Sequence, residues 1–448
     1  MPSKSFSVEI KNKIIPFQKT IKIDSDKSIS IRSFLLGSIC QNLSFANNVL
    51  ESEDVKSTIS VCRKLGVKIV RTKPMSYKIY GKGIGSLVAK KNLKLNFGNS
   101  GTLARLLIGI LSTTPDIAVK IKGDHSLNKR SMKKLIDLMK QFGASFFPRN
   151  KYNFPLKLVS SQMPIGIKYN AGVSAQLKSS VILAGLNSYG LTQIIEQVRS
   201  RDHTENLLIK NKKVIRIHYK EKKIIKLIGK KKLEPLNINV PGDPSSAAFF
   251  TALTLLNHNS SLKIKNVGLN PTRIGFYNIL KKQAAKIKFS NLVRENNEIR
   301  GDIFVKSCKI KPLKASKEYY VNSTDEYPIL FIIAGLTRGI SIFSGIKDLA
   351  NKESNRITEM QKILKQVGIK SIASKDKIKI YGKGIIEARD KSILVQNLGD
   401  HRICMSAFIL ALLTGAKTKI KNFETVFTSS PSFLKTMKSL GAKFEKKN

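Results

Sequence analysis

Apolar stretches of helical length recur along the chain, and each opens on a short cluster of small or polar residues. Asp, Ser, Asn and Gly favour the position just before a helix, where an oxygen of the side chain can accept a hydrogen bond from a free backbone N–H group. The clusters open at residues 26–28, 98–102, 172–176, 242–246, 323–326 and 399–402, about 70 to 80 residues apart. The pattern therefore predicts six strongly apolar helices in a sixfold internal repeat.

Between these helices the pattern changes to second helices, amphipathic and basic, followed by β-rich segments. Residues 78–84 and 379–385 both read Lys-Ile-Tyr-Gly-Lys-Gly-Ile, which predicts a strand and a tight turn. Each repeat is therefore expected to run strand, helix, strand, helix and hairpin, a βαβαββ unit. Most second helices end on a glycine stop, at Gly66, Gly143, Gly368 and Gly441, and Ala284 and Ala285 hold the equivalent place in the fourth repeat.

Six repeats divide naturally into two groups of three, which predicts two domains. Residues 240–244 mark one passage between the groups, and residues 23–27 occupy the same place relative to their own helix. We expect residues 24–240 to form an inserted domain, and residues 1–23 to join residues 241–448 in the second. Crossings near 22–27 and 239–244 would then form a hinge, and ligands often bind in clefts between domains.

The composition is that of a globular protein. Hydrophobic residues make up 42% of the 448-residue chain, enough for large cores. The four cysteines lie far apart, which favours buried free thiols over disulfides or zinc. The N-terminus lacks the apolar region of a signal peptide, and the apolar runs are shorter than the ~20 residues of a membrane span. We therefore expect a cytoplasmic protein with no metal, no cofactor and no membrane partner.

The net charge of +50, from 80 Lys and Arg against 30 Asp and Glu, is typical of proteins that bind nucleic acids. The lysines are spread along the whole chain, however, and Trp is absent. The sequence contains no helix-turn-helix, RNP or zinc-finger pattern. A nucleic-acid-binding protein remains an alternative, but the charge also suits a protein that attracts small polyanions.

The polar clusters carry many side chains that bind anions. Helix N-termini attract phosphate and carboxylate groups, and guanidinium groups bind them through paired hydrogen bonds. If the helix starts converge, they predict a site for several anionic groups at once. The residues concerned are Lys27, Ser28, Arg32, Asn99, Gly101, Thr102, Arg105, Arg130, Ser174, Gln176 and Arg402.

A second kind of candidate site combines carboxylates with cations. On a helix, Lys352, Glu353 and Arg356 would share a face, because they stand three and four residues apart. A carboxylate held among cations can exchange protons with a bound substrate. Asp325 is expected at a helix mouth, because Pro328 suits the first helical position. The structural alternatives are a surface ion-pair ladder and a simple helix cap.

Seven motifs span nearly the whole chain. They are Asp26-Lys27-Ser28-Ile29-Ser30-x-Arg32, Gly98-Asn99-Ser100-Gly101-Thr102-x-x-Arg105, Ser174-Ala175-Gln176-x-Lys178-Ser179, Ser200-Arg201-Asp202-His203-Thr204-Glu205, Asp325-Glu326-Tyr327-Pro328, Lys352-Glu353-Ser354-x-Arg356 and Asp400-His401-Arg402. In this order they resemble the 5-enolpyruvylshikimate-3-phosphate synthase family, in its second class. The resemblance implies an α/β fold, a two-domain inside-out α/β barrel of six βαβαββ repeats, three per domain.

The resemblance also implies an activity, the transfer of the enolpyruvyl group of phosphoenolpyruvate to the 5-hydroxyl of shikimate 3-phosphate in the shikimate pathway of aromatic amino acid biosynthesis. Phosphate would leave through a tetrahedral adduct. The implied ligands of shikimate 3-phosphate are Lys27, Ser28, Arg32, Ser174, Gln176, Ser200, Asp325 and Lys352. Those of phosphoenolpyruvate are Lys27, Asn99, Gly101, Arg130, Gln176, Arg356 and Arg402.

For this reaction our hypothesis is that Lys27, Asp325 and Glu353 are catalytic. Asp325 would contact the 5-hydroxyl, Glu353 would exchange the proton at carbon, and Lys27 would balance the charge of the leaving phosphate, while the sequence leaves open which carboxylate performs which proton transfer. We expect a monomer whose partners are its two small-molecule substrates. Gly101 leaves room for the inhibitor glyphosate, so sensitivity to glyphosate is predicted.

Some positions depart from the family pattern. Asp24-Ser25 stands where Pro-Gly is usual, Ser131 where Pro is usual, and Thr428 where part of the family has Lys. The nearest alternative of the same fold is a UDP-N-acetylglucosamine enolpyruvyl transferase. That enzyme uses a cysteine in a mobile loop, and no cysteine here lies in a comparable polar loop near Arg130.

Overall fold

The computed structural model describes residues 5–219, 221–396 and 399–447, which form two compact units. The inserted unit comprises Ser25–Val240 with Asn296–Glu298, and the flanking unit comprises residues up to Asp24, Pro241–Glu295 and residues from Ile299 onward. Each unit has its own hydrophobic core. The sequence places Asp24 in the inserted domain, but it lies in the flanking unit, where its carboxylate accepts hydrogen bonds from Ser430 and Ser432.

The described part of the inserted unit contains three four-stranded sheets of one topology. In each sheet the first neighbouring pair is parallel and the other pairs are antiparallel. The strands, in sheet order, are β14 (Asn237–Asn239), β3 (Leu43–Asn47), β5 (Ser76–Tyr80) and β4 (Lys68–Lys73); β6 (Lys94–Asn96), β7 (Ala118–Lys122), β9 (Leu156–Val159) and β8 (Ser145–Phe147); and β10 (Lys168–Ala171), β11 (Leu191–Glu196), β13 (Lys223–Ile228) and β12 (Ile215–Tyr219).

The described part of the flanking unit also contains three four-stranded sheets. The parallel pairs are β2–β15, β18–β19 and β22–β23. The strands, in sheet order, are β16 (Ile287–Glu295), β17 (Glu298–Lys306), β15 (Ser261–Gly268) and β2 (Gln18–Ile21); β18 (Lys314–Ala315), β19 (Gly339–Ser344), β21 (Lys377–Gly382) and β20 (Lys370–Ala373); and β22 (Ser392–Val395), β23 (Lys417–Ile420), β1 (Ser7–Ile10) and β24 (Glu445–Lys447).

Three strands join sheets whose other strands lie far away in the sequence. The strand β14 comes from the end of the inserted segment and pairs in parallel with β3, whereas β2 comes from the N-terminus and pairs in parallel with β15. The strand β1 completes the last sheet between β23 and β24. With these three strands in place, all six sheets follow the predicted βαβαββ pattern, which is confirmed.

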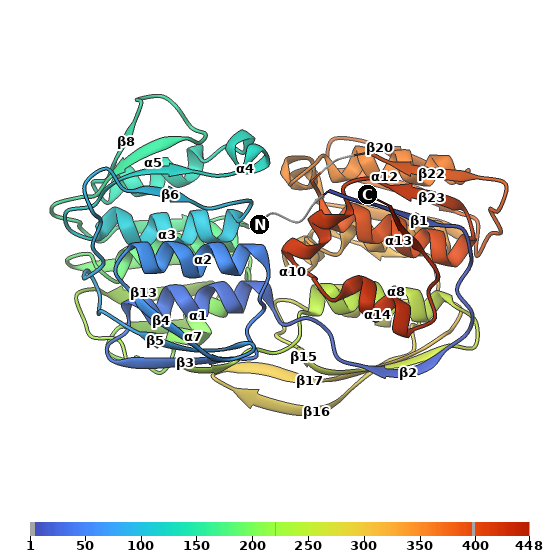
Figure 1. Cartoon of the computed structure of the whole chain (residues 1–448), viewed down its shortest axis with the longest axis horizontal. Helices are drawn as coiled ribbons and strands as arrows, with labels where there is room; N and C mark the ends of the chain where they lie inside the picture. Colours follow the sequence, from blue (N-terminus) through green and yellow to red (C-terminus); the bar gives the residue numbers. More distant parts are fainter. Residues whose placement is uncertain (1–4, 220, 397–398, 448) are drawn as a thin grey trace. The chain divides into compact units, whose positions relative to one another are not determined.

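All six predicted apolar helices are present and begin at the polar clusters. Most of their residues are buried in the cores; every residue of α13, for example, is buried. Figure 1 shows α1, α2 and α3 stacked within the inserted unit, with β3, β4 and β5 along its outer edge. The six helices are α1 (Lys27–Ile39), α3 (Gly101–Thr113), α6 (Ala175–Gly185), α8 (Pro244–Leu256), α11 (Tyr327–Gly335) and α13 (His401–Thr414).

The remaining helices are shorter or amphipathic. They are α2 (Glu53–Lys64), α4 (His125–Lys129), α5 (Lys133–Gln141), α7 (His203–Leu208), α9 (Gly275–Lys282), α10 (Tyr320–Ser323), α12 (Arg356–Gln366) and α14 (Phe433–Ser439), with 3₁₀ turns η1 (Lys317–Tyr319), η2 (Lys347–Asn351) and η3 (Phe423–Thr428). The predicted glycine stops after α2, α5, α12 and α14 all have a positive φ, and Ala284 adopts φ +66° in the same place after α9.

The two identical heptapeptides have a structural role, as predicted. They cover the ends of β5 and β21 and the turns that follow. A Cβ at Gly81 would collide with the carbonyl of Cys40, and one at Gly382 with the carbonyl of Thr337. Glycine is therefore needed where each strand passes the end of an apolar helix.

Two local predictions are wrong. Helix α12 begins only at Arg356, after the cap residue Asn355, so Lys352 and Glu353 do not share a helix face with it. Pro328 is the second residue of α11 rather than the first, and Glu326, not Asp325, holds the cap position. The predicted free thiols are confirmed: Cys40, Cys62 and Cys404 are buried, and Cys308 is half-buried.

Candidate active site

Lys27 and Arg32 lie on the first two turns of α1, where the helix dipole is positive. Asp26 caps the helix by accepting a hydrogen bond from the Ile29 N–H at 2.8 Å. Lys27 Nζ lies 3.1 Å from Asp54 Oδ2, and Asp54 is buried in the first turn of α2. Asp54 is a site residue that the sequence reasoning missed. The ion pair holds the Lys27 ammonium group at the start of the helix.

The guanidinium group of Arg32 is buried and held by hydrogen bonds. Its Nε donates to Thr204 Oγ1 at 2.8 Å, its Nη2 to Ser179 Oγ at 3.2 Å, and its Nη1 to the carbonyl of Ser28 at 3.0 Å. Ser179 lies on α6 and Thr204 on α7. Three helices thus meet at this side chain.

Helices α3 and α6 also begin beside each other. Gln176 Nε2 donates to Thr102 Oγ1 at 2.9 Å, and Ser174 caps α6 by accepting from Leu177 N–H. Because Arg32 joins α1 to α6, the starts of α1, α3 and α6 gather at one end of the inserted unit. The convergence predicted from the polar clusters is present within this unit.

Arg130 and Arg105 lie over the start of α3. Arg130, in the turn after α4, donates to Asn99 Oδ1 and to Ser126 Oγ. Arg105 Nη1 donates to the carbonyl of Gly101 at 3.1 Å. A Cβ at Gly101 would stand 2.7 Å from Arg105 Nη1 and 3.3 Å from Arg130 Nη1. The absence of a side chain at Gly101 therefore keeps both guanidinium groups close to the helix start.

Ser200 is fully buried. Its backbone N–H and its hydroxyl both donate to Glu196 Oε1. Glu196 belongs to a buried group of four charges, here called the charge cluster: Lys178, Glu196, Glu205 and Lys223. The motif at residues 200–205 thus has a structural part, which the sequence reasoning did not separate from its binding part.

The charge cluster makes stability depend on pH. Burial alone would raise the pKa of Glu205, but Lys178 and Lys223 outweigh it and lower the pKa from 4.5 to about 2. The charged form is therefore favoured by folding, and its contribution to stability is complete above pH ~4.5 and lost as the pH falls towards ~2.

Urea unfolding at pH 5, 4 and 3 is expected to show that the free energy of unfolding falls steeply in the wild type and less steeply in Glu205→Gln. Equal slopes would contradict this role, and Glu445→Gln, at an exposed position, is the control.

In the flanking unit, Arg356 stands among three carboxylates. Its Nε lies 2.9 Å from Asp400 Oδ2, its Nη2 2.8 Å from Glu353 Oε2, and its Nη1 3.7 Å from Asp325 Oδ1. The side chain is 1% exposed. Burial alone would lower the pKa of Arg356, but Asp400, Glu353 and Asp325 outweigh it and raise the pKa. The two carboxylates with an expected catalytic role, Asp325 and Glu353, thus share one fixed positive charge.

Arg402 lies at the start of α13 and is 4% exposed. Its guanidinium carbon lies 5.9 Å from the centre of the Phe249 ring. Its Nε and Nη1 are buried and have no hydrogen-bond partner among the described residues. Leaving buried donors unsatisfied is costly, so this arrangement suits an anionic ligand.

The turn before α12 brings further candidate residues to this place. Ser354 Oγ donates to Asp400 Oδ2 at 3.0 Å, and Asp400 also caps α13 through the Arg402 N–H. Lys352 follows η2 directly and is half-buried. The starts of α12 and α13 are therefore joined through Asp400.

Asp24 also has a defined place, although it departs from the family pattern. Its Oδ2 accepts hydrogen bonds from the hydroxyls of Ser430 and Ser432, both at 2.8 Å, and from the Ser432 N–H at 3.0 Å. Burial raises the pKa of Asp24, and the bonds from Ser430 and Ser432 oppose that rise only in part. Asp24 thus fixes the chain to the flanking unit immediately before it passes to Ser25.

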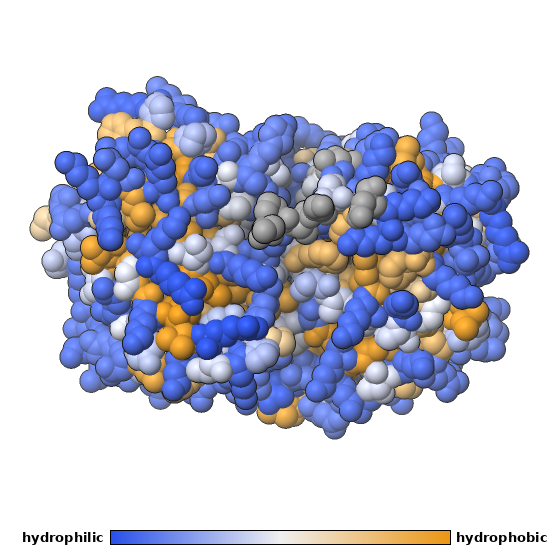
Figure 2. Space-filling view, viewed as in Figure 1, coloured by the Kyte–Doolittle hydropathy of each residue, from blue (hydrophilic) through white to orange (hydrophobic). Residues whose placement is uncertain are grey.

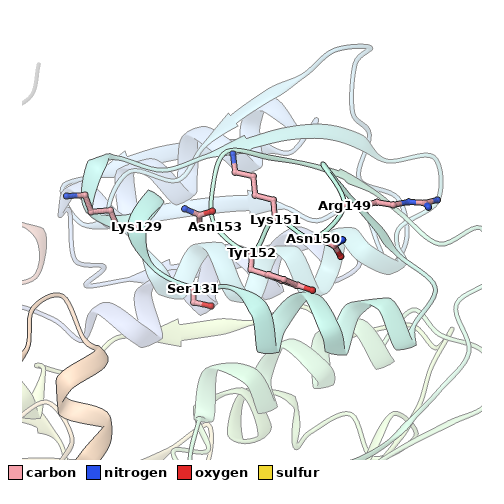
Figure 3. A pocket seen from close by; sticks show the side chains of 7 residues that line it. All are labelled: Lys129, Ser131, Arg149, Asn150, Lys151, Tyr152 and Asn153. Carbon is pink, nitrogen blue, oxygen red and sulfur yellow. The ribbon is translucent and has the colours of Figure 1, made fainter.

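A hollow of about 520 Å³ in the inserted unit is a poor candidate for the site. It is lined by Lys129, Ser131, Arg149, Asn150, Lys151, Tyr152 and Asn153. Figure 3 shows the side chains of Lys129, Lys151 and Arg149 pointing in different directions rather than towards one point. On the face shown in Figure 2, hydrophilic residues are spread widely rather than gathered on one element, as the distribution of lysines along the sequence suggests.

Among the residues with described positions, no three or more His, Cys, Asp and Glu side chains are grouped so that they could hold a metal ion. None of the helices in the described ranges combines the length and the apolar character that crossing a membrane requires.

The six repeats around buried helices are the fold of the enolpyruvyl transferases. The enolpyruvyl transferase NikO from Streptomyces tendae matches with a TM-score of 0.73 over 99% of this chain and 98% of that chain, at 12% identity, which shows a shared fold alone. The EPSP synthase structure from Acinetobacter baumannii matches with a TM-score of 0.85 and 33% identity, over 99% of this chain and 100% of that chain.

Sequence comparison defines the family. Residues 11–437 match the family model described as EPSP synthase (3-phosphoshikimate 1-carboxyvinyltransferase). The 3-phosphoshikimate 1-carboxyvinyltransferase of Paramagnetospirillum magneticum is 34% identical, and that of Zymomonas mobilis is 36% identical, each over 97% of both chains. The chain belongs to the EPSP synthase family, whose members are transferases.

Proposed function

We propose that the protein transfers the enolpyruvyl group of phosphoenolpyruvate to the 5-hydroxyl of shikimate 3-phosphate and releases phosphate. The observation that carries the proposal is the match to 3-phosphoshikimate 1-carboxyvinyltransferases over 97% of the chain. The seven motifs and the two groups of charged residues around helix starts support it. The reaction belongs to the shikimate pathway of aromatic amino acid biosynthesis.

The inserted unit supplies most of the groups that we assign to shikimate 3-phosphate. The dipole of α1, the ammonium group of Lys27 and the guanidinium group of Arg32 all favour a phosphate or a carboxylate. The assigned ligands here are Lys27, Ser28, Arg32, Ser174, Gln176 and Ser200, with Asp325 and Lys352 from the flanking unit. The Ser200 hydroxyl already donates to Glu196. It would therefore accept a hydrogen bond from the substrate, or leave Glu196 in order to donate one.

Phosphoenolpyruvate carries a phosphate and a carboxylate, and the groups assigned to it suit both. The buried donors of Arg402 lack partners among the described residues, and Arg356 is fixed by Asp400. Guanidinium groups held in this way bind carboxylate and phosphate oxygens in pairs. The full assigned set is Lys27, Asn99, Gly101, Arg130, Gln176, Arg356 and Arg402.

The chemistry requires three proton transfers and the departure of phosphate. The 5-hydroxyl oxygen bonds to carbon 2 of phosphoenolpyruvate and loses its proton, while carbon 3 gains one. The resulting adduct then loses phosphate from carbon 2 and a proton from carbon 3. We assign the contact with the hydroxyl to Asp325, the proton at carbon 3 to Glu353, and the charge of the phosphate to Lys27.

Gly101→Ala tests the assignment around α3. The added methyl group would displace Arg105 and Arg130, whose flexible ends can move without unfolding the helix. We expect the KM for phosphoenolpyruvate to rise about tenfold, with little change for shikimate 3-phosphate, and the inhibition constant of glyphosate to rise as well. The matched control is Gly172→Ala, because the new Cβ would meet no described atom within 4 Å. Unchanged KM values in Gly101→Ala would contradict the assignment.

A phosphate-release assay tests the proposed function. Purified protein is given phosphoenolpyruvate with either shikimate 3-phosphate or UDP-N-acetylglucosamine as the acceptor. We expect release only with shikimate 3-phosphate. Release with the UDP sugar alone would contradict the proposal, and so would a lack of release combined with steeply salt-dependent binding to DNA or RNA.

We further propose that the protein acts as a cytoplasmic monomer. Its assigned ligands all come from one chain, and the substrates are small molecules. Size-exclusion chromatography with light scattering is expected to give the mass of one chain at micromolar concentration. A mass of two chains that persists on dilution would contradict the proposal.

A further inference from the structure

The hydroxyls of Thr204 and Ser179 form a bonded pair beneath Arg32. Thr204 Oγ1 accepts from Arg32 Nε at 2.8 Å and donates to Ser179 Oγ at 2.8 Å, and Ser179 Oγ accepts from Arg32 Nη2 at 3.2 Å. Both hydroxyl residues are buried, at 1% and 0% exposure. A guanidinium group is planar, so bonds to Nε and Nη2 fix the plane of the whole group.

The charge cluster holds these two hydroxyls in place. Ser179 follows Lys178 on α6, and Thr204 precedes Glu205 on α7. Lys178 Nζ lies 2.8 Å from Glu205 Oε1, and Lys223 Nζ lies 3.0 Å from the same oxygen. An ion pair and a hydroxyl pair at adjacent positions thus join the same two helices. A shift of α7 against α6 would break both.

We propose that Thr204 and Ser179 are positioning residues that set the plane of the Arg32 guanidinium group for shikimate 3-phosphate. The proposal rests on the proposed function, in which Arg32 binds that substrate. Neither hydroxyl is assigned to contact a substrate. Their effect is to present the N–H edge of Arg32 in one orientation, so that a planar or tetrahedral anion meets donors already in place.

The test compares Thr204→Val, which keeps the shape but removes the hydroxyl, with Thr204→Ser, which keeps the hydroxyl. Thr204→Val is expected to raise the KM for shikimate 3-phosphate about tenfold, because a hydrogen bond to a charged group is lost, and to change the KM for phosphoenolpyruvate less than about twofold. Thr204→Ser is expected to restore the wild-type value. The control is Thr114→Val, another buried threonine of the same unit, whose hydroxyl donates only to the carbonyl of Ile110 among the described residues.

A double-mutant cycle with Arg32→Gln separates positioning from a general loss of stability. In the Arg32→Gln background, Thr204→Val is expected to have little further effect on the KM for shikimate 3-phosphate. An unchanged KM in Thr204→Val, or an equal and additive rise in the Arg32→Gln background, would overturn the proposal. The wild-type protein is assayed first for phosphate release. An inactive wild type would refute the proposed function rather than the positioning role.

Discussion

Arg356→Met is expected to lower kcat/KM about a thousandfold and to destabilise the flanking unit by about 3–5 kcal/mol. The loss of activity follows because Arg356 is assigned to phosphoenolpyruvate and stands between Asp325 and Glu353. The loss of stability follows because Asp400, which is fully buried, would keep its charge without its guanidinium partner. Steady-state kinetics and urea unfolding measure the two effects separately.

A second substitution distinguishes the two roles of Arg356. Asp400→Asn in the Arg356→Met background removes the uncompensated charge but keeps a residue type that caps helices well, so it is expected to recover stability without recovering turnover. Arg389→Met is the control, because that side chain is 80% exposed. A normal kcat/KM in Arg356→Met would contradict the role of Arg356 in binding. Recovery of kcat/KM in the double variant would show that the loss of activity came from misfolding.

Lys27→Met and Glu353→Gln are each expected to lower kcat by about 10²–10⁴. Lys27 is assigned to the leaving phosphate, and Glu353 to the proton at carbon 3. Both side chains are partly exposed, at 18% and 22%, so their removal leaves the cores intact. Single-turnover experiments with both substrates measure the chemical step directly.

The matched controls come from an ion pair on α12 in which Lys362 is exposed and Glu359 is half-buried. Lys362 and Glu359 form a 2.8 Å ion pair, and Lys362 is 63% exposed. Lys362→Met and Glu359→Gln repeat the same chemical changes away from the assigned residues and should leave kcat unchanged. Asp54→Asn is expected to have an intermediate effect, because it frees Lys27 from its anchor. Near-normal turnover in both Lys27→Met and Glu353→Gln would refute the catalytic assignment.

The six apolar helices could be predicted because the signal is local. Before α1, α3 and α6 a cap residue (Asp26, Ser100 and Ser174) stands directly ahead of the apolar run, and its side chain accepts a hydrogen bond from the N–H group three residues on. Where a local signal was misread, the prediction failed. Asn355 accepts a hydrogen bond from Thr358 N–H and starts α12, so Lys352 and Glu353 fall outside the helix.

The residues that support the assigned ligands could not be predicted, because their contacts join distant parts of the sequence. Asp54 lies on a different helix from Lys27, and Thr204 is 172 positions from Arg32. Each is an ordinary residue in its own stretch, and only the packing of α1, α2, α6 and α7 gives it a role. The resemblance supplied the ligands but not these supports.

The turn between β16 and β17 was missed for the same reason. Its residues Asn296–Glu298 belong to the inserted unit although both strands extend into the flanking unit. Glu298 Oε1 lies 2.8 Å from His203 Nδ1 and 3.0 Å from Asn206 Nδ2. In the sequence, two asparagines between strands indicate only a turn. No local signal shows that this turn belongs to the inserted unit.

The central claim is that the chain performs an addition followed by an elimination on phosphoenolpyruvate. The most direct measurement is NMR of a reaction in D₂O containing wild-type protein, phosphoenolpyruvate and shikimate 3-phosphate. Carbon 3 becomes a methyl group in the adduct and then loses one proton, so the account expects free phosphate and an enol ether whose methylene group carries deuterium. Unreacted phosphoenolpyruvate, or a product without deuterium at that carbon, would contradict it.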